Sequence, residues 1–224
     1  MDFGNILSFL EKLSENNNRE WFNEHKAEYT QLKNEFENFI QQLIPKVNEI
    51  DPSIGLLEAK DCVFRIYRDV RFSKNKAPYK NHFGAYISNS GRKSKFAGYY
   101  LHIQPGESFI AAGAYSPEPE ILKEIRFEIL DNLKSFKSII DTNEFKKYFN
   151  GIIGESLKTA PKGFPKDFEG LELIKFKSFE VIHSLENKAL QLPDNEEYIL
   201  KVMGIAQPYN NFFNKVIAHT INEE

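Results

Sequence analysis

Residues 65–80, RIYRDVRFSKNKAPYK, carry six cationic side chains and one acidic one. The whole chain of 224 residues has a formal net charge of -3, so this segment is strongly basic within an acidic protein. Arginine binds phosphate or carboxylate through paired N–H groups, and lysine adds charge without a fixed geometry. The segment therefore predicts a site for a small phosphorylated or carboxylated ligand.

We expect six side chains of this segment to contact the anion: Arg65, Arg68, Arg71, Lys76, Tyr79 and Lys80. Arg68 and Arg71 would bind the anionic group of the ligand. Lys76, Tyr79 and Lys80 would cover it from the loop. If the protein is an enzyme, Asp69 and His82 are the acid–base candidates nearest to that anion along the chain. The sequence leaves open whether any catalysis takes place.

Arg68 is the most informative residue of the segment. If residues 64–72 form a strand, side chains alternate between faces, and Arg68 then shares an otherwise apolar face. A guanidinium group removed from water needs a partner. That partner is a structural carboxylate such as Glu20 or Glu24, a set of carbonyls, a water-filled cavity or a bound anion, unless a shift of register returns Arg68 to solvent.

Two further functions compete with a small-ligand site. The basic loop could dock an acidic partner or a nucleic-acid strand, with tyrosines such as Tyr67, Tyr79 and Tyr100 as stacking platforms. Tyrosine is also a good strand former, and a net charge of -3 makes nucleic acid the less favoured partner. In the third interpretation the arginines form purely structural ion pairs.

No metal site or cofactor is indicated. The histidines do not have the spacing of a zinc-binding helix, although His82 and His102 lie on neighbouring predicted strands and could converge. Cys62 is the single cysteine, which excludes an internal disulfide framework, and we expect it to be buried and structural.

We expect a protein of the cytoplasm that does not interact with membranes. No segment approaches the roughly 20 apolar residues of a membrane-spanning helix. The first residues, MDFGNILSFLEKL, lack the basic start and apolar run of a signal peptide. The oligomeric state is not indicated.

Helical periodicity is strongest near the N-terminus. It predicts a short helix over 3–14 and a long continuous helix over 18–44, which ends at Pro45. Asn17 would cap the long helix, with Glu20 completing a capping box. Further helices are predicted over 116–134 and near the C-terminus, where Pro208 breaks or kinks the pattern.

Residues 54–115 instead show strand patterns separated by turn sequences. The predicted strands are CVFRIYRDV, NHFGAYIS, FAGYYLHIQ and SFIAAGAYS, with an extra one near IGLLEA and a late one near 174–185. The fold class is therefore α+β, as a single domain over 1–224 that is helical over 1–50, mainly strands over 54–115 and mainly helical over 116–224. We expect an antiparallel sheet of about four to six strands, packed by the N-terminal and C-terminal helices.

Five segments, in order along the chain, resemble the family known as domain of unknown function 2461, which is found in bacteria and fungi. They are NNNREWFNEHKAEY (16–29), FRIYRDVRFSKNKAPYKNHFGAYI (64–87), AGYYLHIQPG (97–106), YSPEPEIL (115–122) and LKTAPKGFPKD (157–167). Ala97 stands where the family tends to have glycine. The resemblance implies no reaction, cofactor or catalytic residue. It does imply that these residues belong to family motifs: Trp21, His25, Lys26, Arg65, Arg68, Asp69, Arg71, Lys76, Tyr79, Lys80 and His82.

Overall fold

A four-stranded antiparallel sheet forms the centre of the computed structural model, which describes residues 1–222. The strands are β1 (Phe83–Ile87), β2 (Gly98–Ile103), β3 (Ser108–Ala114) and β4 (Phe179–Leu185), in the order β1-β2-β3-β4. Short connections join the first three strands, as the turn sequences predicted, whereas β4 returns to the sheet after several helices. The α+β class is confirmed, with four strands.

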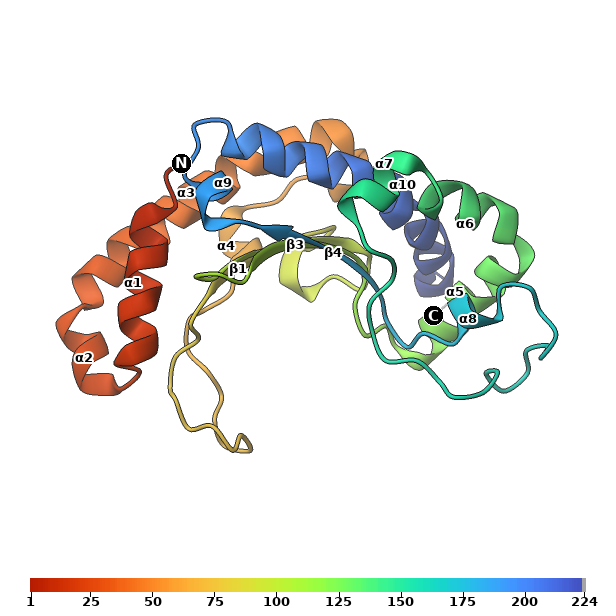
Figure 1. Cartoon of the computed structure of the whole chain (residues 1–224), viewed down its shortest axis with the longest axis horizontal. Helices are drawn as coiled ribbons and strands as arrows, with labels where there is room; N and C mark the ends of the chain where they lie inside the picture. The colour runs from red at the N-terminus through yellow and green to blue at the C-terminus, as the bar shows by residue number, and fades with distance from the viewer. Residues whose placement is uncertain (223–224) are drawn as a thin grey trace.

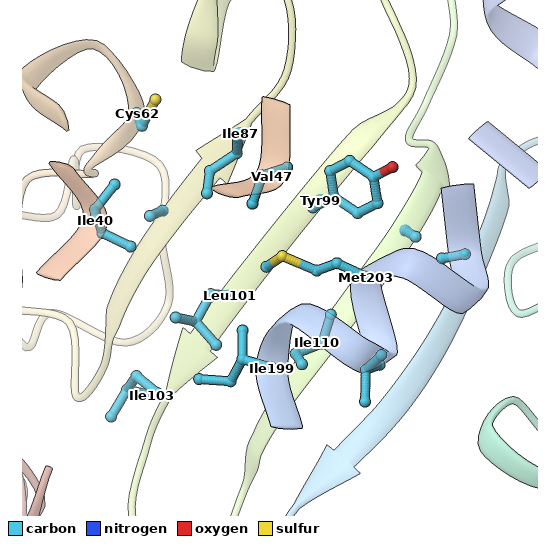
Figure 2. Close-up of a cluster of buried hydrophobic side chains, with 14 of the residues drawn as sticks. Ile40, Val47, Cys62, Ile87, Tyr99, Leu101, Ile103, Ile110, Ile199 and Met203 are labelled. Carbon is cyan, nitrogen blue, oxygen red and sulfur yellow. The ribbon is translucent and has the colours of Figure 1, made fainter. Parts of the chain in front are cut away.

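Two long helices, α3 (Lys26–Ile50) and α10 (Asn195–Asn222), cover the same face of the sheet (Figure 1). Strand alternation directs Tyr99, Leu101 and Ile103 of β2 toward these helices, where all three are fully buried. Figure 2 shows them packed with Ile40 and Val47 of α3 and with Ile199 and Met203 of α10. The opposite face of β2 presents Tyr100 and His102.

Shorter helices surround this centre. They are α1 (Gly4–Glu15), α2 (Arg19–Glu24), α4 (Ala59–Cys62), α5 (Pro119–Asp131), α6 (Leu133–Ile140), α7 (Asn143–Tyr148), α8 (Leu171–Ile174) and α9 (Asn187–Leu190), with 3-10 turns η1 (Pro52–Ile54) and η2 (Gly91–Lys93). The buried apolar side chains form one continuous cluster that begins at Phe3 and reaches Ile217. Among the helices of residues 1–222, none combines the length and apolar character needed to cross a membrane.

The predicted helix over 18–44 differs from the structure at both ends. It is divided at His25 into α2 and α3, and α3 continues through Pro45 to Ile50. Burial of Ile44 and Val47 on either side of Pro45 offsets the hydrogen bond that proline cannot donate. Pro208 likewise lies within α10, which changes direction along its length (Figure 1).

The two predicted strands before β1 are absent. The IGLLEA region holds the end of η1 and an irregular segment, and CVFRIYRDV begins at the end of α4. Residues 63–68 instead pair with 78–85 through isolated bridges, Val63 with Ala85 and Tyr67 with Tyr79. A continuous ladder does not form, because Pro78 has no N–H and the outer hydrogen bonds of Tyr79 go to the side chain of Asn17.

Candidate functional site

Residues 63–85 form an irregular hairpin that runs into the first residues of β1, and we call it the basic hairpin. Its two arms are joined by backbone hydrogen bonds from Lys80 N–H to the Ile66 carbonyl (2.8 Å) and from Arg68 N–H to the Pro78 carbonyl (2.9 Å). The connecting loop projects away from the sheet (Figure 1). The sequence-predicted ligand residues therefore divide between the base of the hairpin and its tip.

Arg68 finds its hydrogen-bond partners within its own loop. Its guanidinium donates to the Ala77 carbonyl at 3.0 Å and to the Ser73 hydroxyl at 3.3 Å. The expected ion pair with Glu20 or Glu24 is absent from residues 1–222, because Arg68 turns back onto its own loop. One backbone carbonyl and one hydroxyl thus take the place of a carboxylate, and Arg68 closes the hairpin.

Two other cations near the tip, Arg71 and Lys76, are also engaged within the loop. Arg71 forms a two-point ion pair with Asp69, with an N–O distance of 2.6 Å, and this partner lowers the pKa of the Asp69 carboxyl. The Lys76 ammonium donates to the Val70 carbonyl at 3.0 Å. Of the predicted ligand residues, Arg68, Arg71 and Lys76 therefore hold the tip in shape.

Tyr79 fixes the hairpin to the N-terminal helices. Its ring stacks on Phe22 with a centroid distance of 3.9 Å, and the residue is buried. The Asn17 side chain accepts from Tyr79 N–H (3.1 Å) and donates to the Tyr79 carbonyl (3.0 Å). The predicted Asn17 cap is therefore wrong by one residue, since Asn18 caps α2 by accepting from Trp21 N–H.

Arg65 and Lys80, at the base of the hairpin, line a cavity of about 580 Å³ that we call the basic pocket. The pocket lies between α3, α4, the hairpin and η2. Its lining consists of Lys33, Glu37, Lys60, Val63, Phe64, Arg65, Lys80 and Arg92. Within residues 1–222, five cations thus face one carboxylate.

Two of these cations are neutralised and three are not. Lys33 pairs with Glu37 at 2.7 Å, and Lys60 pairs with Glu58. In the part of the chain that the structure describes, Arg65, Lys80 and Arg92 form no ion pair. The pocket therefore keeps positive charge that no protein carboxylate compensates.

Lys80 has the least favourable surroundings for a charge. Its Nζ lies 5.2 Å from the centroid of the Phe64 ring, and the Arg92 guanidinium lies 5.9 Å from the same centroid. Burial, followed by repulsion from Arg65 and Arg92, lowers the pKa of Lys80. A bound anion would relieve that repulsion.

His82 and His102 converge, as their neighbouring positions predicted, with ring centroids 4.2 Å apart. Burial, then the nearby His102 and Lys80, lowers the pKa of His82 to about 3. Burial also lowers the pKa of His102, whose Nδ1 lies 3.0 Å from the Tyr100 hydroxyl and whose Nε2 lies 3.0 Å from Gln104 Oε1. Both imidazoles are neutral at pH 7.

This arrangement weakens the case for Asp69 and His82 as an acid–base pair. Asp69 is bound to Arg71 at the tip, whereas His82 packs on His102 beside the sheet. A histidine whose pKa is about 3 is poorly suited to proton transfer near neutral pH. Residues 1–222 contain no group of three or more His, Cys, Asp or Glu side chains placed to hold a metal ion.

Cys62 lies beside the pocket but is fully buried, and burial raises the pKa of its thiol to about 11. A thiol with that pKa is almost entirely protonated at neutral pH and is a weak nucleophile. The expectation of a buried, structural cysteine is confirmed.

Comparison with known proteins places the chain in a family. The family model described as conserved hypothetical protein (DUF2461) matches residues 5–212. The chain belongs to this family. The resemblance drawn from the five sequence segments is confirmed, and the match spans the basic hairpin and every strand of the sheet. No curated protein and no solved structure matches the chain.

Sequence reasoning missed three cations of the basic pocket: Lys33, Lys60 and Arg92. They come from α3, α4 and η2, outside residues 65–80. The GRK turn at 91–93 carries charge, but its sequence does not indicate which surface it faces. Only the packing of η2 against α4 brings Arg92 to Phe64.

Proposed function

We propose that this protein binds a small phosphorylated or carboxylated ligand in the basic pocket. The observation that carries the proposal is the set of three cations, Arg65, Lys80 and Arg92, that lack an ion pair within residues 1–222 and line one cavity. Of the predicted ligand residues, this assigns direct contact to Arg65 and Lys80. Arg68, Arg71, Lys76 and Tyr79 support the site by shaping the hairpin.

Electrostatics favours an anion at this position. Two unit charges 4 Å apart attract by about 4 kcal/mol at an effective dielectric constant of 20, before desolvation is counted. A single anion at the centre of the pocket would approach three cations at once and would offset the repulsion among them. The volume of about 580 Å³ lies within the range of small-molecule sites and exceeds the size of a lone phosphate. Phe64 and Val63 supply an apolar wall for the remainder of the ligand.

Isothermal titration with pyrophosphate, sugar phosphates, nucleotides and dicarboxylates tests the proposal. We expect Arg92→Gln to weaken binding of the best ligand by about tenfold or more, since a charged hydrogen bond contributes roughly 1.5–3 kcal/mol. Lys93→Gln is the matched control, because Lys93 is the next residue of η2, is exposed and does not line the pocket. Equal effects of the two substitutions, or no binding by any of these anions, would contradict the proposal.

A second candidate function rests on the tip of the basic hairpin. Phe72 is 97% exposed there, with the Arg71 guanidinium 5.9 Å from its ring centroid. An exposed aromatic ring among cations suits stacking on a base of a single-stranded nucleic acid. This function predicts that the protein binds an oligonucleotide and that this binding weakens steeply as the salt concentration rises. Binding should be lost in Phe72→Ala. It should be retained in the control Leu56→Ala, which removes another fully exposed apolar side chain. Binding unaffected by Phe72→Ala would exclude the tip.

A further inference from the structure

Lys80 differs from the other two lysines of the basic pocket. Lys33 and Lys60 each form an ion pair with a carboxylate. Within residues 1–222, Lys80 has neither an ion pair nor a hydrogen bond from its amine. Its Nζ lies instead over the Phe64 ring, in a half-buried position that faces the cavity.

These surroundings are those of a nucleophilic lysine. An amine attacks a carbonyl carbon only when it is unprotonated, so a site that disfavours the ammonium form raises its reactivity. Here burial removes hydration from the amine, and Arg65 and Arg92 repel a third positive charge. The same two arginines are placed to hold the anionic end of a ligand beside the amine.

We propose that Lys80 forms a Schiff base with an aldehyde or ketone that also carries a phosphate or carboxylate group. The inference rests on the proposed function, since Arg65 and Arg92 would bind that anionic group. It adds a covalent step and narrows the ligand class to carbonyl-bearing anions.

The step balances without an oxidant or a reductant. The lone pair of Lys80 Nζ forms a bond to the carbonyl carbon, and the carbonyl oxygen takes up a proton to give a carbinolamine. This intermediate loses its hydroxyl as water, and a carbon–nitrogen double bond replaces the carbon–oxygen one. The products are an imine and one water molecule, and hydrolysis reverses the reaction.

Reductive trapping tests the inference. The full chain is incubated at pH 7 with pyridoxal 5′-phosphate, an aldehyde that bears a phosphate, and then reduced with sodium borohydride. Peptide mass spectrometry locates the stable secondary amine. We expect Lys80 to be modified several-fold faster than any other lysine, because burial and the neighbouring Arg65 and Arg92 favour its free amine.

Three comparisons make the result specific. Lys80→Arg keeps the charge but should lose the adduct, whereas Lys93→Arg should not alter modification of Lys80. Excess pyrophosphate should protect Lys80 in the unaltered protein, which gives a readout independent of any variant. Pyridoxal, which lacks the phosphate, should modify Lys80 more slowly.

The outcomes separate the two proposals. If pyrophosphate binds in the titration but trapping modifies exposed lysines and Lys80 alike, the Schiff-base inference is wrong and anion binding stands. If none of the titrated anions binds and pyrophosphate does not protect Lys80, the basic pocket is not an anion site and both proposals fail. Selective, pyrophosphate-sensitive modification of Lys80 supports both.

Discussion

Asn17 should contribute more to stability than an asparagine in a surface turn usually does. Its side chain makes two hydrogen bonds to the backbone of Tyr79, at 3.0 and 3.1 Å, and Tyr79 is only 5% exposed. Asn17→Ala removes both bonds and leaves a buried N–H and a buried carbonyl without partners. Each bond contributes about 1 kcal/mol, and an unsatisfied buried group costs roughly 1–3 kcal/mol. We therefore expect the free energy of unfolding to fall by about 2–4 kcal/mol.

The neighbouring asparagine provides the control. The Asn16 side chain makes one exposed hydrogen bond, to the Lys12 carbonyl at 2.9 Å, so Asn16→Ala should cost less than about 1 kcal/mol. Urea unfolding should show a lower midpoint for Asn17→Ala at an unchanged m-value. Hydrogen exchange of the Tyr79 amide should accelerate in that variant alone.

The same substitution links stability to the pocket. Lys80 follows Tyr79 directly, so loosening Tyr79 should also weaken anion binding. If Asn17→Ala and Asn16→Ala lower the urea midpoint equally, the contact between Asn17 and Tyr79 does not hold the hairpin, and the assignment of its anchor is wrong.

Two further perturbations test the sheet and the histidine pair. Gly113→Ala should lower the free energy of unfolding by more than about 3 kcal/mol, because φ is +116° and the new Cβ would lie 1.8 Å from the Phe179 carbonyl oxygen. Gly106→Ala, which has open space around it, should lower it by about 1 kcal/mol. Thermal unfolding measures both. Similar losses in both would show that β3 and β4 move apart easily. The folded state lowers the pKa of His82 from 6.5 to about 3, so the unfolded chain binds the proton more tightly than the folded one. The stabilisation of the folded state is therefore complete above about pH 6.5 and is lost as the pH falls toward 3. Between pH 7.5 and pH 5, the free energy of unfolding should fall by about 2 kcal/mol more in the unaltered protein than in His82→Gln. An equal fall in both proteins would contradict the buried, neutral state of His82.

Local patterns in the sequence were sufficient for the sheet from residue 83 onward and for the general position of the long helices, but not for the division at His25 or for the end of α3 beyond Pro45. Period-2 alternation places Tyr99, Leu101 and Ile103 on one face, and short turns bring successive strands together, so β1 to β3 followed without knowledge of distant contacts. The α+β class, the family and the charge excess of residues 65–80 were likewise accessible from the chain alone. The same alternation failed for residues 64–72, because Pro78 and the Asn17 side chain limit the pairing of that segment to isolated bridges.

Tertiary structure alone decided which polar groups meet. Three consecutive asparagines, 16–18, are equivalent by local rules, and the position of Tyr79 determines that Asn17 binds the hairpin while Asn18 caps α2. Arg68 satisfies its guanidinium within its own loop, so the pocket draws instead on Arg92, which local spacing does not relate to Lys80. Charge along a chain is a local property, whereas an uncompensated charge depends on every carboxylate that the fold brings near, and that is a property of packing.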